Sequence, residues 1–516
     1  MKNEKSVAGS ISLVMVIMIF SRLLALLSTQ VYLSFFGAGG QQINIYSYAI
    51  SVPNIIFTCF GTALATVVIP IYAGHIARSE TIEAKKFADN LITITLIFTA
   101  VLVVIGMGLS FILPRFTAFN ETPEDYNFAV KALMIMMPVM IFYAMNYIFQ
   151  GMLQSIGKFG WPAAVSIPSS LIVILYVVFL GDKFGVTGLL VATFIGLSMQ
   201  AIILIPPLLF AGYRYKPSLN FKDSDIVTAG KMTLPVLLGV SAYQFNMFYN
   251  VTMIANFKGM VTLLTYVQNI TLYMVLAFVY SITAVIYPRL TEHAATGDME
   301  GYKKTLTDIT KTIIVLLVPI AFGFIAVRYR LLELIAKWGQ ITDSDIAAAS
   351  KLLLMYSLGI VAIGIKEVYD RAFYALKNTL LPALNGFVIM GINIVLSLVL
   401  IRFIGPFGIP LAYSVASICG AVILLVSLRK KIGSLGGGLM PCFLKSLLAA
   451  ALMYAAVFFL DKYLSSALSG DAVSLRLVRL FVPAVAGAVV YAVFGYILRI
   501  DYIVNIVNKI LRRGEA

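Results

Sequence analysis

A single arginine interrupts a long apolar segment near the N-terminus. Arg22 is the only charged residue of MVIMIFSRLLALLSTQVYLSFF, residues 15–36, and the apolar run begins at Ile11. Because an arginine at the bilayer centre costs about 2.5–3.5 kcal/mol on insertion scales, it needs a polar partner. A guanidinium that faces an aqueous cavity would bind an anion, and its paired N–H groups suit phosphate oxygens. The alternative is a structural arginine that donates to backbone carbonyls of a neighbouring helix.

Small polar side chains follow one face of the second apolar segment. Their spacings of three and four residues place them along one side of a helix. The stripe consists of Asn44, Ser47, Ser51, Asn54, Thr58, Thr62 and Thr66. Small polar residues can serve helix packing in membranes, but a stripe of this length with two asparagines favours the wall of a hydrated cavity.

Amides recur in two later apolar segments. Gln244, Asn246 and Asn250 lie in one of them, and Asn269 lies in the next. The candidate substrate-binding residues are therefore Arg22, Asn44, Ser51, Asn54, Thr58, Gln244, Asn246, Asn250 and Asn269. Residues 11–36 and 227–256 contain no carboxylate. This argues against a coupled exporter of cations, which needs an intramembrane Asp or Glu.

The elements that must position these residues are membrane-spanning helices. The 516 residues are 60% hydrophobic and 12% charged, with a mean hydropathy of +0.96, whereas a soluble domain has about 25% charged residues. Apolar runs long enough to cross a bilayer predict fourteen spans. Their centres lie near residues 23, 58, 101, 141, 171, 199, 241, 275, 316, 360, 391, 418, 451 and 488. The three cysteines and two histidines are too scattered for a disulfide framework, a metal site or a catalytic triad.

The net charge of +15 follows the positive-inside rule. Lys and Arg concentrate in the even-numbered connections and the C-terminal tail, which places both termini in the cytoplasm and needs no nucleic-acid partner. In the tail, residues 501–516, Ile503, Ile506, Val507 and Ile510 share one helical face, which predicts an interfacial helix on an anionic membrane surface.

The chain repeats itself at an offset of 218 residues. Phe60, Val67, Pro70, His75, Ala77, Lys85 and Lys86 recur as Phe278, Val285, Pro288, His293, Ala295, Lys303 and Lys304. A six-helix unit copied in the same orientation predicts an all-α polytopic fold with two lobes around a central cavity, as in transporters that work by alternating access. The expected parts are residues 1–218, residues 219–431, two appended helices in residues 432–500, and the tail. Glycines and prolines would let helices bend during the cycle, namely Gly37, Gly39, Pro53, Pro70 and Pro288.

Three segments resemble the MurJ/MviN family of lipid II flippases, within the multidrug/oligosaccharidyl-lipid/polysaccharide exporter superfamily. They are FSRLLALLSTQVYLSFFGAG, SVPNIIFTCFGTALATVVIPIY and RAFYALKNTLLPA. The resemblance implies transport of undecaprenyl-diphosphate-linked peptidoglycan precursor to the outer leaflet of a bacterial plasma membrane, with the polyprenyl tail along the last two helices. Arg22 matches a family arginine. The chain departs from the family at other charged positions, where it has Ser28, Asn44, Phe57 and Asn269.

The resemblance implies membrane lipids as partners, no cofactor, a coupling ion or the membrane potential as the drive, and a monomer. One alternative is a flippase for another lipid-linked oligosaccharide. A second is a cation or drug antiporter of the same superfamily. A third is a membrane enzyme such as a glycan polymerase, for which Glu121, Glu124 and Asp125 form the only acidic outward group. We expect no catalytic residue.

Overall fold

Apolar helices account for nearly all of the chain. The computed structural model describes residues 2–337, 339–468, 470, 472–505 and 508, and no strand occurs within them. Nine helical stretches in this part of the chain are long and apolar enough to cross a membrane, or ten if the bent pair α13–α14 counts as one span. Two of them, Gly160–Phe210 and Leu380–Ile432, each contain two predicted centres. The predicted seventh and eighth centres lie in α9 and α11, which are helical but are not among these nine.

The all-α prediction is confirmed, and each of the fourteen predicted centres falls within a helix. The first eleven elements are α1 (Lys2–Phe36), α2 (Gln41–Ala77), α3 (Thr81–Leu109), η1 (Leu113–Phe116), η2 (Ala118–Asn120), α4 (Pro123–Met136), α5 (Val139–Ser155), α6 (Gly160–Ala164), α7 (Ile167–Ile202), α8 (Ile205–Phe210) and α9 (Ser224–Ile254). The others are α10 (Met260–Gln268), the π-helical turn η3 (Asn269–Tyr273), α11 (Met274–Thr296), α12 (Met299–Ala336), α13 (Asp343–Ser357), α14 (Ile360–Ala375), α15 (Leu380–Ile404), η4 (Gly405–Phe407), α16 (Gly408–Ile432), α17 (Leu439–Ala467) and α18 (Val473–Ile497).

By its internal contacts the chain forms two compact units. The first consists of residues 1–262 and 338–341, and the second of residues 263–337 and 342–516. These units are defined by packing, whereas the division near residue 218 comes from the sequence repeat and stays a prediction. The difference lies in α9, which packs along α2 and so belongs to the first unit.

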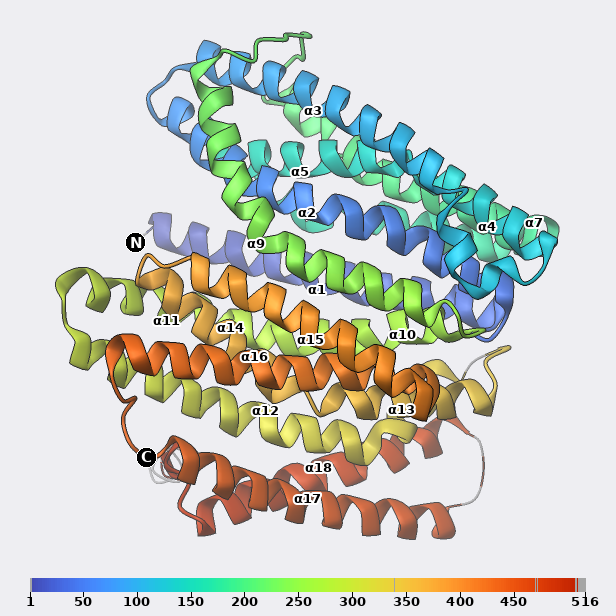
Figure 1. Cartoon of the computed structure of the whole chain (residues 1–516), viewed down its shortest axis with the longest axis vertical. Helices are drawn as coiled ribbons and strands as arrows, with labels where there is room; N and C mark the ends of the chain where they lie inside the picture. Colours follow the sequence, from blue (N-terminus) through green and yellow to red (C-terminus); the bar gives the residue numbers. More distant parts are fainter. Residues whose placement is uncertain (1, 338, 469, 471, 506–507, 509–516) are drawn as a thin grey trace. The chain divides into compact units, whose positions relative to one another are not determined.

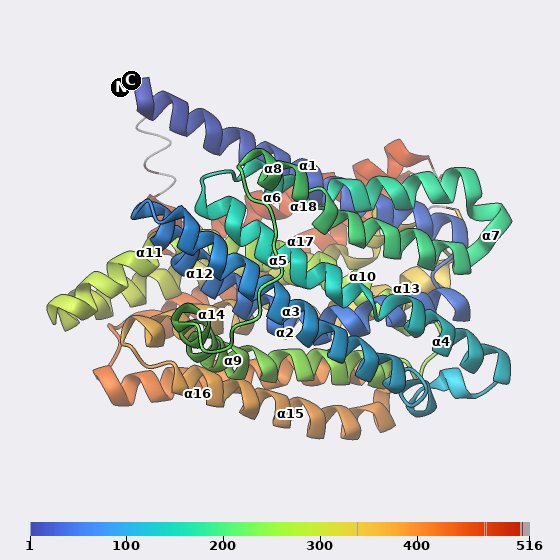
Figure 2. The ribbon, with the colours of Figure 1, turned by 90° about the horizontal axis from the view of Figure 1, so that it is seen from above.

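In the first unit, α2 is the central helix. It packs against α3, α4, α5 and α9, and α1 lies along α7 (Figures 1 and 2). Helix α7 covers two predicted spans, because Gly185 has φ 56° and ψ −149° and breaks the helix there. The Tyr176 hydroxyl donates to the Gly185 carbonyl over 2.7 Å and so satisfies a backbone group that the break exposes.

In the second unit, α12 is the longest helix and packs against α11, α13, α14, α17 and α18. Helices α15 and α16 form one antiparallel pair, and α17 and α18 form another (Figure 1). A cluster of buried apolar residues joins α12 to the last two helices, and it includes Ile314, Val318, Ala449, Met453 and Val457. The predicted appended pair therefore packs directly on α12. In the predicted tail helix, Ile506, Val507 and Ile510 lie outside the described residues.

The sequence repeat has a structural counterpart in two helix–turn–helix segments. His75, at the end of α2, lies with Nδ1 2.8 Å from Oε2 of Glu80. His293, at the end of α11, lies with Nδ1 2.8 Å from Oδ2 of Asp298. Glu80 and Asp298 are themselves 218 residues apart and precede α3 and α12, respectively. Both turns are therefore closed by the same bond from a histidine to a carboxylate five residues later.

Asp89 of α3 fixes the connection between α8 and α9. It is 5% exposed and accepts from Lys85 Nζ over 2.5 Å, from the Tyr213 hydroxyl over 2.8 Å and from the Lys216 N–H over 3.2 Å. Hydrogen bonding to this carboxylate, after burial itself, raises the pKa of Tyr213. The next residue, Asn90, exchanges two hydrogen bonds with the Asn220 backbone, at 2.7 and 2.8 Å.

We expect Asp89→Ala to lower the free energy of unfolding by about 2 kcal/mol, because it leaves the donors of Lys85 and Tyr213 with no acceptor in a buried place. Glu83→Ala is the matched control. It removes the exposed 2.8 Å ion pair with Lys86, which contributes less than about 1 kcal/mol. Denaturation of the purified protein in detergent measures both. Equal losses in the two variants would contradict the role given to Asp89.

Candidate functional site

A polar cavity lies inside the first unit, between α2, α5 and the second half of α7. Its volume is about 170 Å³. The lining residues are Asn54, Phe57, Thr58, Tyr143, Asn146, Tyr147, Gln150 and Gln200. They carry four amides and three hydroxyls, and none of these eight described residues is charged. An uncharged ligand with many hydrogen-bonding groups is the chemistry that such a lining suits.

Helix α2 contributes Asn54 and Thr58 one turn apart. The Thr58 hydroxyl donates to the Asn54 carbonyl over 2.7 Å and lies 3.3 Å from Asn54 Oδ1. Asn54 Nδ2 in turn lies 3.4 Å from the hydroxyl of Tyr143 on α5. Asn54 is exposed while Tyr143 is buried, so this contact reaches from the mouth of the cavity to its wall.

Helix α5 contributes four residues on one face. Gln150 Nε2 donates to Asn146 Oδ1 over 2.9 Å, and Asn146 is 7% exposed. Tyr147 lies against α2 at Gly61, where a Cβ atom would come within 2.2 Å of its ring. Only a glycine at this position allows the two helices to approach so closely.

Aromatic rings form the apolar part of the wall. The ring centroid of Phe57 lies 6.4 Å from that of Tyr143, in a stacked orientation, and 6.3 Å from that of Tyr147. Phe57 is 1% exposed. On the α7 side, Gln200 Nε2 donates to Ser169 Oγ over 3.0 Å. Amides beside aromatic faces are suited to a ligand with both polar edges and apolar faces, such as a sugar ring.

The structure divides the predicted stripe of α2 into two parts. Asn54 and Thr58 line the cavity, as predicted. Asn44 is fully buried, and its Oδ1 accepts from the N–H groups of Val261 and Thr262 over 2.8 and 3.4 Å. This contact satisfies the free amides at the start of α10. The Ser51 hydroxyl donates to its own helix, at Ser47 O over 2.8 Å. In the described structure, therefore, Asn44 and Ser51 make packing contacts.

The remaining predicted binding residues lie elsewhere, and their binding role stays a prediction. Arg22 is exposed on α1, while its neighbour Ser21 is buried and donates to Ala163 O over 2.9 Å. Asn246 and Asn250 are buried on α9, and Gln244 is half-buried there. Asn269 opens the π-helical turn η3 in the second unit, an irregularity that is frequent at functional sites.

The predicted hinge residues fall at turns and inside helices, and hinge motion stays a prediction. Gly37 has φ +77° and follows the last turn of α1, which is the position that favours glycine. Gly39 follows it in the same turn. Pro53 and Pro70 lie inside α2, where each removes one helical hydrogen bond. Pro288 falls in α11, and its side chain lies outside the described residues.

Besides Phe57, five lining residues were not among the predicted ones, namely Tyr143, Asn146, Tyr147, Gln150 and Gln200. The first four follow spacings of three, one and three residues, which is one helical face. The same periodicity that singled out α2 could therefore have found α5. Gln200 stands alone in its segment, and only the packing of α7 shows its role.

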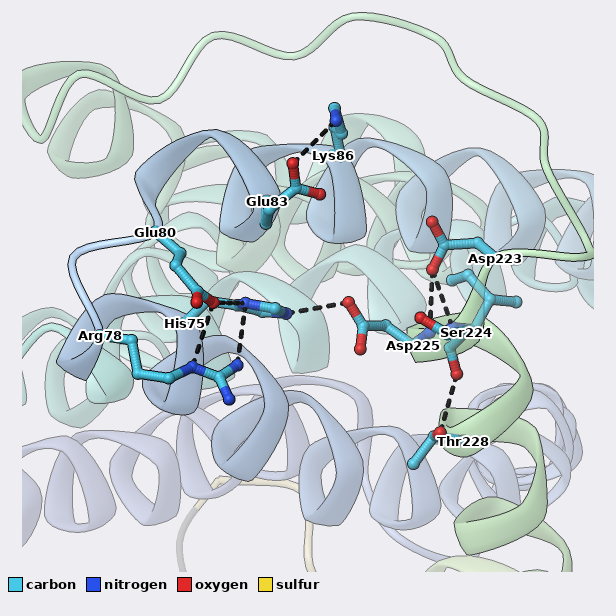
Figure 3. A network of polar contacts seen from close by, with 10 residues as sticks. His75, Arg78, Glu80, Glu83, Lys86, Asp223, Ser224, Asp225 and Thr228 are labelled. Carbon is cyan, nitrogen blue, oxygen red and sulfur yellow. Dashed lines mark hydrogen bonds and ion pairs between the residues drawn. The ribbon is translucent and has the colours of Figure 1, made fainter.

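A charged network closes the end of the first unit, where α2 ends and α9 begins (Figure 3). His75 is 7% exposed, and its two ring nitrogens contact two carboxylates. Nδ1 lies 2.8 Å from Glu80 and Nε2 lies 2.9 Å from Asp225 of α9. When both carboxylates are ionised, these two bonds need a proton on each nitrogen, as in the imidazolium form. Arg78 Nη2 also lies 3.2 Å from Nδ1. Arg78 completes the network, with Nε 3.1 Å from Glu80.

The electrostatics agree with this geometry. The hydrogen bond to Glu80 raises the pKa of His75, with Asp225 adding to it, and burial and Arg78 act in the opposite direction. The same bond lowers the pKa of Glu80. The network thus connects α9 to the α2–α3 turn through a charged histidine.

The comparisons with known proteins agree with the fold. The family model of the lipid II flippase MurJ matches residues 32–499. The chain belongs to this family. A relative from Vibrio cholerae serotype O1, named a probable lipid II flippase MurJ, is 24% identical over 420 residues, which cover 79% of this chain and 80% of the relative. A relative from Thermosipho africanus, named lipid II flippase MurJ, is also 24% identical and covers 80% of this chain and 83% of its own length.

A solved structure gives the same fold for this MurJ-family chain. The lipid II flippase MurJ in an inward closed conformation aligns with a TM-score of 0.79 at 23% identity, over 95% of this chain and 99% of that one. An inward-facing multidrug resistance transporter of the MATE family aligns with a TM-score of 0.66 at 14% identity, over 80% and 95% of the two chains. The family resemblance and the multi-pass membrane fold predicted from the sequence are thus confirmed.

We expect the contribution of His75 to stability to depend on pH. Because the pKa of His75 is raised, its stabilising effect is fully present below the ordinary value of about 6.5 and is lost as the pH rises through the raised value. His75→Asn should therefore lower the melting temperature most near pH 6 and little near pH 9. His293→Asn is the control, since its histidine bonds the carboxylate of its own turn. A difference between wild type and His75→Asn that stays constant over this range would contradict the imidazolium bridge.

Proposed function

We propose that this chain moves lipid II, the undecaprenyl-diphosphate-linked peptidoglycan precursor, from the inner to the outer leaflet by alternating access. The observation that carries the proposal is the family match over residues 32–499, together with relatives named as lipid II flippases. The uncharged amide-rich cavity of the first unit supports it, because a disaccharide head group offers hydroxyl and acetamido groups to such a lining.

In this proposal, different residues bind the diphosphate and the sugar of the ligand. Arg22 binds the diphosphate, because a guanidinium pairs with two phosphate oxygens at once. Asn54, Asn146 and Gln150 bind the sugar, and the half-buried ring of Tyr147 lies against its apolar face. Asn44, Ser51, Gln244, Asn246, Asn250 and Asn269 would act on other parts of the head group or on the moving helices.

The proposed transporter also has a defined orientation, oligomeric state and energy source. Both termini face the cytoplasm, since Lys and Arg gather in the connections assigned to that side. The chain works as a monomer, needs no cofactor and catalyses no covalent step. A coupling ion or the membrane potential drives the cycle.

A flippase for another lipid-linked oligosaccharide is the second candidate. The observation in its favour is the site of Phe57, where the family resemblance suggested a basic residue. Phe57 is 1% exposed and packs among Tyr143 and Tyr147, so this position contributes no charge for a diphosphate. A ligand with a weaker anionic group or a larger sugar would suit this wall.

Complementation tests the function. Bacteria depleted of their own lipid II flippase would express this chain, and labelled lipid II in the outer leaflet would be counted. We expect the native chain to restore labelling and Arg22→Ala to abolish most of it, with exposed Arg115→Ala as the control at matched membrane levels. No restoration by the well-expressed native chain would contradict lipid II as the substrate. Restoration by Arg22→Ala would leave the flippase and remove Arg22 from its site.

The cavity has a separate test. We expect Asn146→Leu and Gln150→Leu to lower the labelling rate about five- to tenfold, because each removes a hydrogen-bonding group that the bound sugar needs. Asn256→Leu, at an exposed position outside the cavity, should leave the rate unchanged. An unchanged rate in both cavity variants would show that the sugar binds elsewhere.

A further inference from the structure

The connection between α16 and α17 runs along α12, as the connection between α8 and α9 runs along α3. Residues 433–438, GSLGGG, join α16 to α17. Three residues on successive turns of α12 face this segment. A Cβ atom built on Gly433 would lie 3.6 Å from Lys303 Nζ, one on Gly436 would lie 3.6 Å from Thr307 Oγ1, and one on Gly438 would lie 3.2 Å from Lys311 Nζ.

The sequence repeat allows these three residues of α12 to be compared with their counterparts on α3. At the offset of 218, Lys303, Thr307 and Lys311 correspond to Lys85, Asp89 and Thr93 of α3. In the first copy, the Asp89 carboxylate lies between the lysine and the connection, and accepts from both. The second copy keeps the lysine, replaces the carboxylate with a threonine and adds another lysine. The second copy therefore keeps the lysine without the carboxylate that binds it in the first copy.

Thr307 is the buried group at the centre of this place. It is 4% exposed, and its Oγ1 has no hydrogen-bond partner among the described residues. Thr310 and Thr312 of the same helix donate to carbonyls four residues earlier, each over 2.8 Å. The hydroxyl of Thr307 lies beside Gly436 instead, where a Cβ atom would be 3.6 Å from Oγ1 and 3.8 Å from the Thr307 methyl group. A buried hydroxyl without a partner is costly, and a bound anion would accept a hydrogen bond from it.

The backbone contributes to the same place. Helix α17 begins at Leu439, directly after Gly438, whose φ is +101°. The first amides of a helix have no partner within the helix, and they carry partial positive charge. Gly438 has no side chain to cover them. Lys303 lies 3.6 Å from the Glu300 carboxylate, whose side chain is 92% exposed, so this carboxylate is not a buried counter-charge.

We propose that Lys303, Thr307, Lys311 and the glycine-rich start of α17 form a binding site for the phosphate group of a membrane lipid. The lipid class follows from the surface beside the site. Met440, Leu444 and Leu448 are 66%, 55% and 51% exposed, and they follow one another at four-residue spacing from the start of α17. A lipid with its phosphate at the lysines would lay its hydrocarbon chains along this stripe. Two lysines and a hydroxyl are point donors that suit a phosphate monoester or a diphosphate.

Three probes separate the sources of the phosphate. Native mass spectrometry of the purified full chain in detergent would measure binding of dioctanoyl phosphatidic acid, of dioctanoylglycerol, which has the same chains without phosphate, and of inorganic phosphate. We expect the phosphatidic acid to bind at least tenfold more tightly than either other probe. Undecaprenyl diphosphate is a fourth probe. Tighter binding of it than of phosphatidic acid would identify the lipid as one of the transported class.

Substitutions of Lys303, Lys311 and Thr307 test whether these residues bind the phosphatidic acid. Lys303→Gln with Lys311→Gln should weaken binding of phosphatidic acid at least tenfold, and Thr307→Val, which keeps the shape, should weaken it several-fold. Lys304→Gln is the matched control, because Lys304 is exposed and belongs to the same helix. Unchanged binding in both the double variant and Thr307→Val would overturn the proposal, as would equal binding of inorganic phosphate or of dioctanoylglycerol. Since the readout is binding, it stands or fails independently of lipid II transport.

Discussion

Every polar group in an apolar helix bundle must find a partner inside the protein. Water that could replace a missing partner is absent from the hydrocarbon region of a membrane. This constraint explains why the polar side chains of α2 do different things along its length. Asn44 satisfies the start of α10, Ser51 bonds its own backbone, and Asn54 meets Tyr143 at a cavity. These contacts satisfy several of the polar groups that α2 brings to the centre of its unit.

The two copies of the repeat have kept their architecture while changing their charges. The α2–α3 turn of one copy and the α11–α12 turn of the other are each closed by a histidine that contacts a carboxylate five residues later. In the first copy the histidine also reaches Asp225 of α9, which makes the turn a connection between elements. The third helices differ more, since the carboxylate of Asp89 stands where the second copy has Thr307. The connection along α3 is therefore bound by a buried acid, whereas the one along α12 faces two lysines and a threonine.

The candidate cavity and the charged network share one element, α2. Asn54 and Thr58 line the cavity near the middle of α2, and His75 lies near its end. Prolines at positions 53 and 70 lie between and beside them. A bend at Pro70, which lies between Thr58 and His75, would move the cavity wall relative to the network. Such a bend would couple ligand binding in the cavity to the contact between His75 and Asp225 of α9.

Composition and periodicity determined much about this protein. The fourteen apolar runs located its helices, because a membrane-spanning segment must be apolar over its whole length whatever its neighbours are. The offset of 218 identified the repeat, and the spacing of Asn54 and Thr58 placed both on a face that proved to line a cavity. The resemblance of three short segments indicated the family. Each of these signals is local or periodic, so it can be read along the chain.

Only the tertiary structure decided which polar residues meet. Asn44 and Asn54 share one stripe, yet Asn44 is fully buried and Asn54 opens into a cavity, because different helices cover the two levels of α2. Gln200 enters the cavity from a segment with no polar pattern, and Thr307 is revealed as unpartnered only by its position beside Gly436. Periodicity gives the face of a helix, but the neighbour that covers that face depends on contacts between residues far apart in sequence. Those contacts determine whether a polar group is satisfied or remains able to bind a ligand.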